Sequence, residues 1–299
     1  MRILVTNDDG VFAPGMAALA VALVEAGHDV TVVAPLEDHS GSSAATILRR
    51  RRPIGAVPFR AVRLPIDPSV PAFGVAAFPA VCVVLALAGT FGPRADLVFA
   101  GINQGPNVGR FILHSGTVGA ALTAAQLDRS ALAIGLRVNW TAPAHYETAV
   151  AVAVALVEPL ASMRTGTVLN CNVPDVGLDA LRGVRCARLN TANIFNVEHT
   201  GSRRVRFSGG FPDRPTAPDD DWALGTLGFA TLTPITYPTT DPDPAVQAAV
   251  AETAARLDAR FAGATISAVE AQATARRRPG GFLARLGGVR RRLTRHVNW

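Results

Sequence analysis

The sequence contains no lysine, so all 29 of its basic residues are arginines. This absence excludes the receiver domains of response regulators, which also place paired acids after a first strand but need a lysine after a later one. Cysteine is scarce too, with only Cys82, Cys171 and Cys186, widely spaced and odd in number. Such a set favours a reducing compartment, without disulfides or a cysteine zinc site. We therefore expect a cytoplasmic protein whose cysteines lie in its core.

Acidic residues are absent from the C-terminal end of the chain. None follows Glu270, whereas eight arginines do: Arg276, Arg277, Arg278, Arg285, Arg290, Arg291, Arg292 and Arg295. The formal net charge of +6 becomes −2 when these eight are set aside. We predict an arginine-rich tail over residues 271–299 that is able to make weak contact with nucleic acid.

Unbroken long apolar runs are also missing. The uncharged stretch over residues 73–93 contains prolines and glycines, so we expect a buried helix over residues 79–87 with flanking loops and no membrane span. The apolar start of the chain has only the length of a strand, so we expect no secretory signal. With 49% hydrophobic and 17% charged residues, the chain is predicted to be globular, with one or two domains.

A strand, a helix and a second strand are predicted within the first 34 residues. Residues 2–6 form a short apolar run, residues 14–26 are rich in alanine and end at Gly27, and residues 29–34 are β-branched and stop at Pro35. Such a βαβ unit predicts an α/β fold with a parallel sheet. The first turn lacks G-x-G-x-x-G, which excludes the dinucleotide-binding fingerprint.

The rest of the chain continues this alternation and then becomes irregular. Further strands are expected over residues 96–102, 131–136 and 168–173, with a weak edge strand over 57–64, and helices over 146–160 and from Pro244, capped by Asp243. Residues 175–240 carry short β-like pieces, over 184–189 and 229–233, which suit an appended β arm.

Two adjacent carboxylates, Asp8 and Asp9, follow the first predicted strand. In open parallel sheets, ligands bind at the carboxyl ends of the strands, and neighbouring carboxylates repel unless a cation neutralises them. A solvated turn is the alternative. Ser40 and Asn103 follow two other predicted strands and supply further oxygen ligands, so the set would suit an octahedral Mg²⁺ or Mn²⁺ ion completed by water.

A possible anion site begins the helix predicted after Leu113. Ser115-Gly116-Thr117 offers hydroxyls and backbone N–H groups, although an ordinary N-cap would explain the same residues. A metal beside an anion site indicates hydrolysis of a phosphate ester, because the ion polarises the phosphoryl oxygen and lowers the pKa of a bound water. The haloacid dehalogenase class is excluded, since it needs Asp-x-Asp where this chain has Asn7-Asp8-Asp9.

Several motifs together resemble the SurE survival-protein family over residues 1–240. They are Asn7-Asp8-Asp9-Gly10, Gly101-Ile102-Asn103-Gln104-Gly105-Pro106-Asn107-Val108-Gly109, Ser115-Gly116-Thr117-Val118-Gly119-Ala120-Ala121, Asn170-Cys171-Asn172-Val173-Pro174 and Thr231-Leu232-Thr233-Pro234. The resemblance implies a 5′/3′-nucleotidase, a nucleoside monophosphate phosphatase that uses one Mg²⁺ or Mn²⁺ ion per subunit.

The resemblance also implies an architecture and an assembly. We expect a Rossmann-like three-layer core over residues 1–175, a β arm over 176–240, a helix over 241–270 and the tail over 271–299. The arm and the helix would exchange between subunits of a homodimer or homotetramer.

Site residues are carried over from the same motifs. The resemblance implies that Asp8, Asp9, Ser40 and Asn103 are the metal ligands, with Asp8, Asp9 and Asn103 as the catalytic group. It places Asn107, Ser115, Gly116 and Thr117 on the phosphate side. His39 and His114 flank the site and are candidates for substrate contact.

The chain departs from the family pattern on the substrate side. Phe12 stands where the family usually has histidine, Ser43-Ala44-Ala45 replaces Gly-His-Ser, and Thr123 replaces a glutamate. The segment over residues 77–83 loses a threonine and an aspartate. No metal ligand is lost. The alternative is therefore a SurE-like protein that keeps the fold and the metal but binds nucleotide or RNA without efficient turnover.

Overall fold

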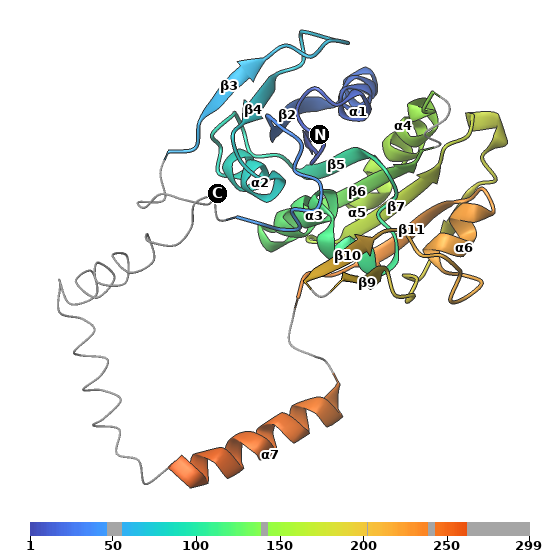
Figure 1. The fold of residues 1–299 in the computed structure, drawn as a ribbon. Helices are drawn as coiled ribbons and strands as arrows, with labels where there is room; N and C mark the ends of the chain where they lie inside the picture. The colour runs from blue at the N-terminus through green and yellow to red at the C-terminus, as the bar shows by residue number, and fades with distance from the viewer. Residues whose placement is uncertain (47–55, 139–142, 202, 239–242, 262–299) are drawn as a thin grey trace, which may run out of the picture. The chain divides into compact units, whose positions relative to one another are not determined.

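The computed structural model describes residues 1–46, 56–138, 143–201, 203–238 and 243–261 (Figure 1). The chain divides into two compact units, residues 1–238 and residues 239–299. The predicted tail lies outside the described residues. Within the described part, no helix is both long and apolar enough to cross a membrane.

The first unit is built on a sheet of nine strands in the order β3-β4-β2-β1-β5-β6-β7-β11-β8 (Figure 1). The strands β4, β2, β1, β5, β6 and β7 run parallel, whereas β3 is antiparallel to β4 and β11 is antiparallel to β7. Their bounds are β1 Arg2–Thr6, β2 Asp29–Pro35, β3 Phe59–Val62, β4 Ala72–Val75, β5 Leu97–Gln104, β6 Ser130–Arg137, β7 Val168–Pro174, β8 Val184–Cys186 and β11 Ala230–Ile235.

Helices cover both faces of this sheet (Figure 1). One face packs against α1 (Pro14–Glu25), α4 (Tyr146–Ala155) and α5 (Val157–Ser162), and the other against α2 (Pro79–Leu87) and α3 (Gly116–Gln126). Because side chains alternate along a strand, Ile3 and Val5 join the first core and Leu4 joins the second. Burial on both faces explains why Ile3, Leu4 and Val5 are all apolar. The predicted α/β fold with a mainly parallel sheet is confirmed.

Some expected elements differ in the structure. The helix expected over residues 146–160 divides at Leu156 into α4 and α5. The expected loop before α2 contains β4, whose Gly74 lets Leu36 pack closely, since a Cβ there would lie 2.4 Å from the Leu36 Cδ2 atom. Cys82 and Cys171 are buried as expected, but Cys186 is exposed because it lies on the edge strand β8.

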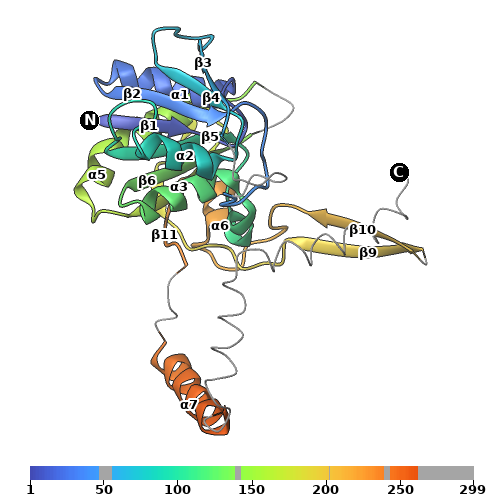
Figure 2. The same ribbon diagram turned by 90° about the vertical axis from the view of Figure 1, so that its left-hand side faces the viewer.

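The irregular region contributes a hairpin, two sheet strands and a short helix. β9 (Phe195–Gly201) and β10 (Arg204–Gly209) form a separate antiparallel sheet that extends away from the nine-stranded sheet (Figure 2). Every described residue of both strands is exposed. A 3₁₀ helix, η1 (Gly109–His114), precedes α3, and α6 (Asp221–Thr226) packs against β11 and β7.

The described part of the second unit is the single helix α7 (Pro244–Phe261). The Asp243 carboxylate accepts the backbone N–H of Ala245 at 2.8 Å, so the predicted cap is confirmed. Val246, Val250 and Leu257 are exposed along this helix.

Two consecutive carboxylates hold the root of the hairpin to the core. Asp220 is fully buried and accepts hydrogen bonds from Thr216, Ala217, Asn190 and the N–H of Ala223 at the start of α6. Burial by itself raises the pKa of Asp220, but these hydrogen bonds outweigh it and lower the pKa.

The neighbouring Asp221 is also buried and joins two segments. Its Oδ2 atom accepts the N–H of Gly109 at 2.7 Å, and its Oδ1 atom accepts the N–H of Asn190 at 3.0 Å. The start of η1 and the segment leading to β9 are therefore bound to one side chain.

Asp220→Ala should lower the free energy of unfolding by about 3 kcal/mol, because it removes a helix cap and leaves buried donors without partners. Urea unfolding at pH 7 measures this change. Asp219→Ala is the matched control, because Asp219 makes an exposed pair with Arg188 and its loss should cost about 0.5 kcal/mol.

The effect of Asp220→Ala should also depend on pH. A carboxylate with a lowered folded-state pKa stabilises the protein above its unfolded-state pKa, near 4, and loses that contribution as the pH falls through the folded value. The difference in stability between the wild type and Asp220→Ala should therefore shrink below about pH 4. A difference that is constant from pH 7 to pH 3 would contradict this account.

Candidate metal and phosphate site

The candidate site lies where β1 and β5 end side by side. Thr6 of β1 pairs with Ala100 of β5, so the residues that follow both strands leave the sheet at the same edge. The chain runs from β1 outward to β2 and β4 and then crosses to β5, so the strand order reverses between β1 and β5. Parallel α/β sheets bind ligands at such a reversal.

The turn after β1 is closed by Asn7, whose side-chain N–H donates to the Gly10 carbonyl at 2.9 Å. Gly10 adopts a φ of 101°, which favours glycine. Asn7 is fully buried and Asp8 almost so, which excludes the solvated turn considered from the sequence.

The Asp8 carboxylate is held at the N-terminus of α3. It accepts a short hydrogen bond from the Thr117 hydroxyl and further ones from the backbone N–H groups of Gly116 and Thr117. Burial raises the pKa of Asp8, and these hydrogen bonds oppose the shift. The Thr117 hydroxyl, expected on the phosphate side, thus orients a carboxylate.

Gly116 is needed for this close approach. A Cβ atom at this position would lie 2.8 Å from both Cβ and Oδ2 of Asp8 and 2.8 Å from the Ser42 hydroxyl. Only the absence of a side chain lets the start of α3 reach the carboxylate.

Asp9 contacts the end of β5. Its Oδ2 atom accepts the backbone N–H of Gln104 at 3.4 Å. Burial, followed by the charge of Asp8, raises the pKa of Asp9 to about 7. A buried carboxylate next to a half-buried one favours a cation, because a cation would return both to the charged form.

Tyr146 lies close enough to Asp9 to be affected by its charge and was not among the predicted site residues. Burial, and then the charge of Asp9, raises the pKa of its hydroxyl. Its ring packs on Gly15, where a Cβ atom would lie 2.7 Å from the Tyr146 Cε1 atom. It begins an alanine- and valine-rich helix far along the chain, and nothing in that local pattern distinguishes it from a packing residue.

The loop that carries Ser40 is attached to the site through the backbone. The N–H of His39 donates to the Asp8 carbonyl at 2.7 Å, and the Ser40 hydroxyl donates to Asp38 at 2.7 Å. Ser40 itself is exposed. The buried Ser42 hydroxyl has no hydrogen-bond partner among the described residues and lies near Asp8 and Gly116, which makes it a site residue that the sequence did not suggest.

Asn103 continues β5 and bonds within its own loop. Its side-chain N–H donates to the Gly105 carbonyl at 2.8 Å, which leaves the amide oxygen available as a ligand. The donor set at this edge of the sheet therefore consists of carboxylate, amide and hydroxyl oxygens.

Asn107 and Ser115 meet on the phosphate side. The Ser115 hydroxyl donates to the Asn107 Oδ1 atom at 2.7 Å and accepts the Val118 N–H at 3.1 Å, so it caps α3 as well. Asn107 is buried, and its Nδ2 group has no hydrogen-bond partner among the described residues. A buried donor of this kind is rare unless a ligand satisfies it.

Two asparagines on β7 hold the Asn107 backbone in place. Asn170 and Asn172 donate to the Asn107 carbonyl at 2.7 and 2.8 Å, and Asn172 accepts the Asn107 N–H at 2.6 Å. Their role was not predicted, although their motif was part of the resemblance.

The neighbouring strand β6 also approaches this loop closely. A Cβ at Gly135 of β6 would lie 2.5 Å from the Gly105 carbonyl oxygen, so glycine is needed there too.

This donor set fits a hard divalent cation. Among the described residues, no three histidine, cysteine, aspartate or glutamate side chains gather in a possible metal cluster. Asp8 and Asp9 would therefore be joined by neutral oxygens such as those of Ser40 and Asn103. Oxygen ligands of this kind suit Mg²⁺ or Mn²⁺.

The positions that depart from the family pattern are apolar or turned inward. Phe12 is exposed in the turn after Asp9, Phe78 packs edge-on against His39 with ring centroids 4.9 Å apart, and the Thr123 hydroxyl donates to the Gly119 carbonyl within α3. None of the three displaces a candidate metal ligand.

Comparison with known proteins agrees with the geometry. The family model for the survival protein SurE matches residues 3–196. The 5′/3′-nucleotidase SurE of Serratia proteamaculans is 36% identical over 242 residues, covering 79% of this chain and 90% of the relative. That of Edwardsiella ictaluri is 38% identical over 243 residues, covering 79% and 89%.

A solved structure has the same fold. The crystal structure of the SurE protein from Aquifex aeolicus matches with a TM-score of 0.67 and 25% identity, covering 81% of this chain and 95% of that one. The family model spans well over half of the chain, and the curated relatives align along most of their length. The chain therefore belongs to the SurE family.

Proposed function

We propose that this protein is a divalent-metal-dependent phosphatase that hydrolyses nucleoside 5′-monophosphates, with 3′-monophosphates as a second substrate class. The observation that carries the proposal is the pair of adjacent carboxylates, the buried Asp8 and the half-buried Asp9, beside the unpaired amide of Asn107. The names of the relatives, 5′/3′-nucleotidase SurE, support the substrate class.

The residues divide into a metal side and a phosphate side. Asp8, Asp9, Ser40 and Asn103 would hold one Mg²⁺ or Mn²⁺ ion per subunit. When bound, that ion supplies a polarised phosphoryl oxygen and a water of lowered pKa. On the other side, Asn107 donates its free N–H to a phosphate oxygen, and Ser115 orients Asn107.

The assembly belongs to the proposal as well. The hairpin exposes Val197, Val205 and Phe207, and apolar side chains of this size on a projecting hairpin favour contact with another chain. We infer a homodimer or homotetramer that uses the hairpin and α7.

A binding protein without turnover is the alternative, and the exposed Phe12 in place of the usual histidine favours it. Phosphate release from a panel of nucleoside monophosphates separates the two functions. Release at enzymatic rates supports the phosphatase, and tight nucleotide binding without release supports the binding protein.

Metal removal should abolish the activity. With EDTA, phosphate release should fall at least a hundredfold, and added Mn²⁺ or Mg²⁺ should restore it, because the carboxylates need a cation to hold the phosphate. A colorimetric phosphate assay measures both steps. Full activity in EDTA would contradict the metal role.

Asp9→Asn should lower kcat at least a thousandfold while leaving the melting temperature close to that of the wild type. The change removes a metal-neutralising charge but keeps the shape of the side chain. Asp29→Asn is the matched control, because Asp29 is an exposed carboxylate at the opposite edge of the sheet and its loss should leave kcat unchanged. Equal activities of the two variants would refute the ligand assignment.

Asn107→Asp should weaken inhibition by inorganic phosphate at least tenfold. The variant keeps an acceptor for Ser115 and keeps the backbone bonds to Asn170 and Asn172, but it replaces the free donor by a carboxylate oxygen that repels phosphate. Product-inhibition kinetics give the constant, and a melting curve confirms that the loop is intact. An unchanged inhibition constant would remove Asn107 from the phosphate site.

A further inference from the structure

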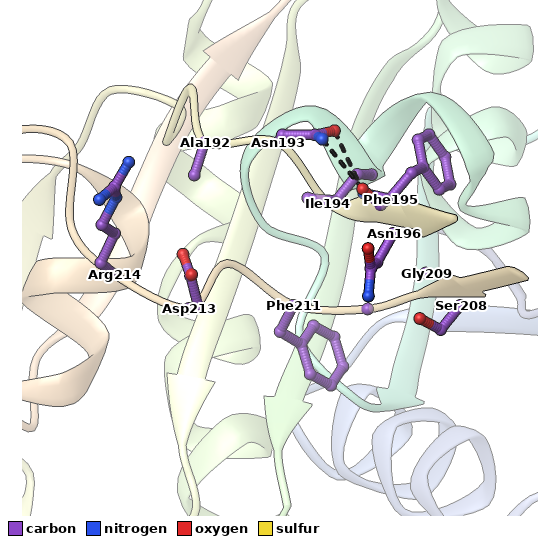
Figure 3. A pocket seen from close by; sticks show the side chains of 11 residues that line it. Ala192, Asn193, Ile194, Phe195, Asn196, Ser208, Gly209, Phe211, Asp213 and Arg214 are labelled. Atoms are coloured by element: carbon purple, nitrogen blue, oxygen red, sulfur yellow. Dashed lines mark hydrogen bonds between the residues drawn. The ribbon is translucent and has the colours of Figure 1, made fainter. Parts of the chain in front are cut away.

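A pocket of about 510 Å³ opens at the root of the hairpin (Figure 3). It lies between residues 192–196, which lead into β9, and residues 208–214, which follow from β10. This volume falls in the range of small-molecule sites. Nothing in the proposed phosphatase chemistry uses this pocket.

Two phenylalanine side chains contribute to the pocket lining. Phe195 and Phe211 line it and are 38% and 44% exposed, so part of each ring remains uncovered. Phe211 is braced by neighbours, with ring centroids 6.1 Å from Phe111 and 6.1 Å from a nearly parallel Trp222. The position of the Phe211 ring is therefore set by its contacts with Phe111 and Trp222.

The pocket borders the phosphate side of the candidate site. A Cβ atom at Gly105 would lie 3.8 Å from the Phe211 Cζ atom, and Gly105 belongs to the loop that carries Asn103 and Asn107. On the other side, the ring of His114, next to Ser115 in the chain, lies 5.3 Å from that of Phe195. A ligand whose phosphate contacts Asn107 can thus extend into the pocket.

Polar groups complete the lining. Figure 3 shows the Asp213 carboxylate and the Asn196 amide between the two segments of chain, from opposite sides of the pocket. Neither side chain has a hydrogen-bond partner in the part of the chain that the structure describes. Together they offer an acceptor for amino or imino N–H groups and an amide for ring nitrogen or carbonyl acceptors.

We propose that this pocket binds the nucleobase of the substrate, with purines preferred, by stacking on Phe211 and by hydrogen bonds from the base edge to Asp213 and Asn196. The proposal rests on the proposed function, since it names the part of the substrate that occupies this space. Bases stack on aromatic side chains because both present a π-face, and the larger purine covers more of the ring. The pocket then separates nucleotides from phosphate esters without a base.

The test uses the full-length protein and Phe211→Ala. Binding of adenosine, which has a base but no phosphate, is measured by calorimetry, and hydrolysis is measured with AMP and with ribose 5-phosphate. In Phe211→Ala, the Kd for adenosine and the KM for AMP should rise at least tenfold with kcat nearly unchanged. Ribose 5-phosphate, which has no base, should be hydrolysed as by the wild type.

Two further variants control for packing. Phe211→Tyr keeps an aromatic face and should retain the wild-type Kd for adenosine. Phe59→Ala removes a comparably exposed phenylalanine from the edge strand β3 and should change neither the Kd for adenosine nor the KM for AMP.

The inference is overturned if the wild type does not bind adenosine or if Phe211→Ala lowers kcat/KM for AMP and ribose 5-phosphate equally. It is also overturned if light scattering shows that Phe211→Ala separates subunits, because the pocket would then be a contact between copies of the chain. A third outcome separates the two proposals. If the wild type binds adenosine and Phe211→Ala does not, the base pocket is supported. If neither ester is hydrolysed with Mn²⁺ or Mg²⁺, the proposed phosphatase activity is refuted.

Discussion

The contact between the Asp8 carboxylate and the N-terminus of α3 determines the rest of the site. Three groups of Gly116 and Thr117 converge on this side chain, and the absence of a Cβ on Gly116 lets them reach it. The helix N-terminus that would attract a phosphate is thereby placed next to the carboxylate that would bind a metal. A bound metal and a bound anion would thus lie close together, because one buried carboxylate is held by one helix.

The two carboxylates are adjacent in sequence but occupy different surroundings. Asp8 is oriented by donors from α3, whereas Asp9 has a long contact with Gln104 and lies near Tyr146. Hydrogen bonds from α3 oppose the effect of burial on the pKa of Asp8, while Asp9 has only one long backbone contact to stabilise its charge. A cation would therefore favour the charged form of both, with Asp8 held in place by α3 and Asp9 less constrained.

Much of the core was predictable because its signals are local. The apolar run of β1, the alanine-rich α1 and the Pro79 start of α2 each determine an element without help from distant residues. β4 was not predictable in this way, since its four residues become a strand through pairing with β2 and β3. The same holds for α6, which depends on packing against β11 and β7.

The candidate site likewise combines residues that local sequence signals predicted with contacts between distant residues that they did not. The strand ends at Asp8, Asp9 and Asn103 were foreseen, because parallel strands end at one edge. The contact of Thr117 with Asp8 joins residues 109 positions apart, and no local pattern specifies it. The unpaired amide of Asn107 is likewise a property of packing around the loop, visible only when every neighbouring donor and acceptor is placed.

Asp221 connects the loop that contains Asn107 to the root of the hairpin. One oxygen holds the N–H of Gly109, at the end of the loop that contains Asn107, and the other holds Asn190, at the root of the hairpin. A Cβ at Gly109 would lie 2.8 Å from the Asn190 carbonyl oxygen, so the two segments touch without any side chain between them. A displacement of the hairpin root would therefore be transmitted through Asp221 to the loop that contains Asn107.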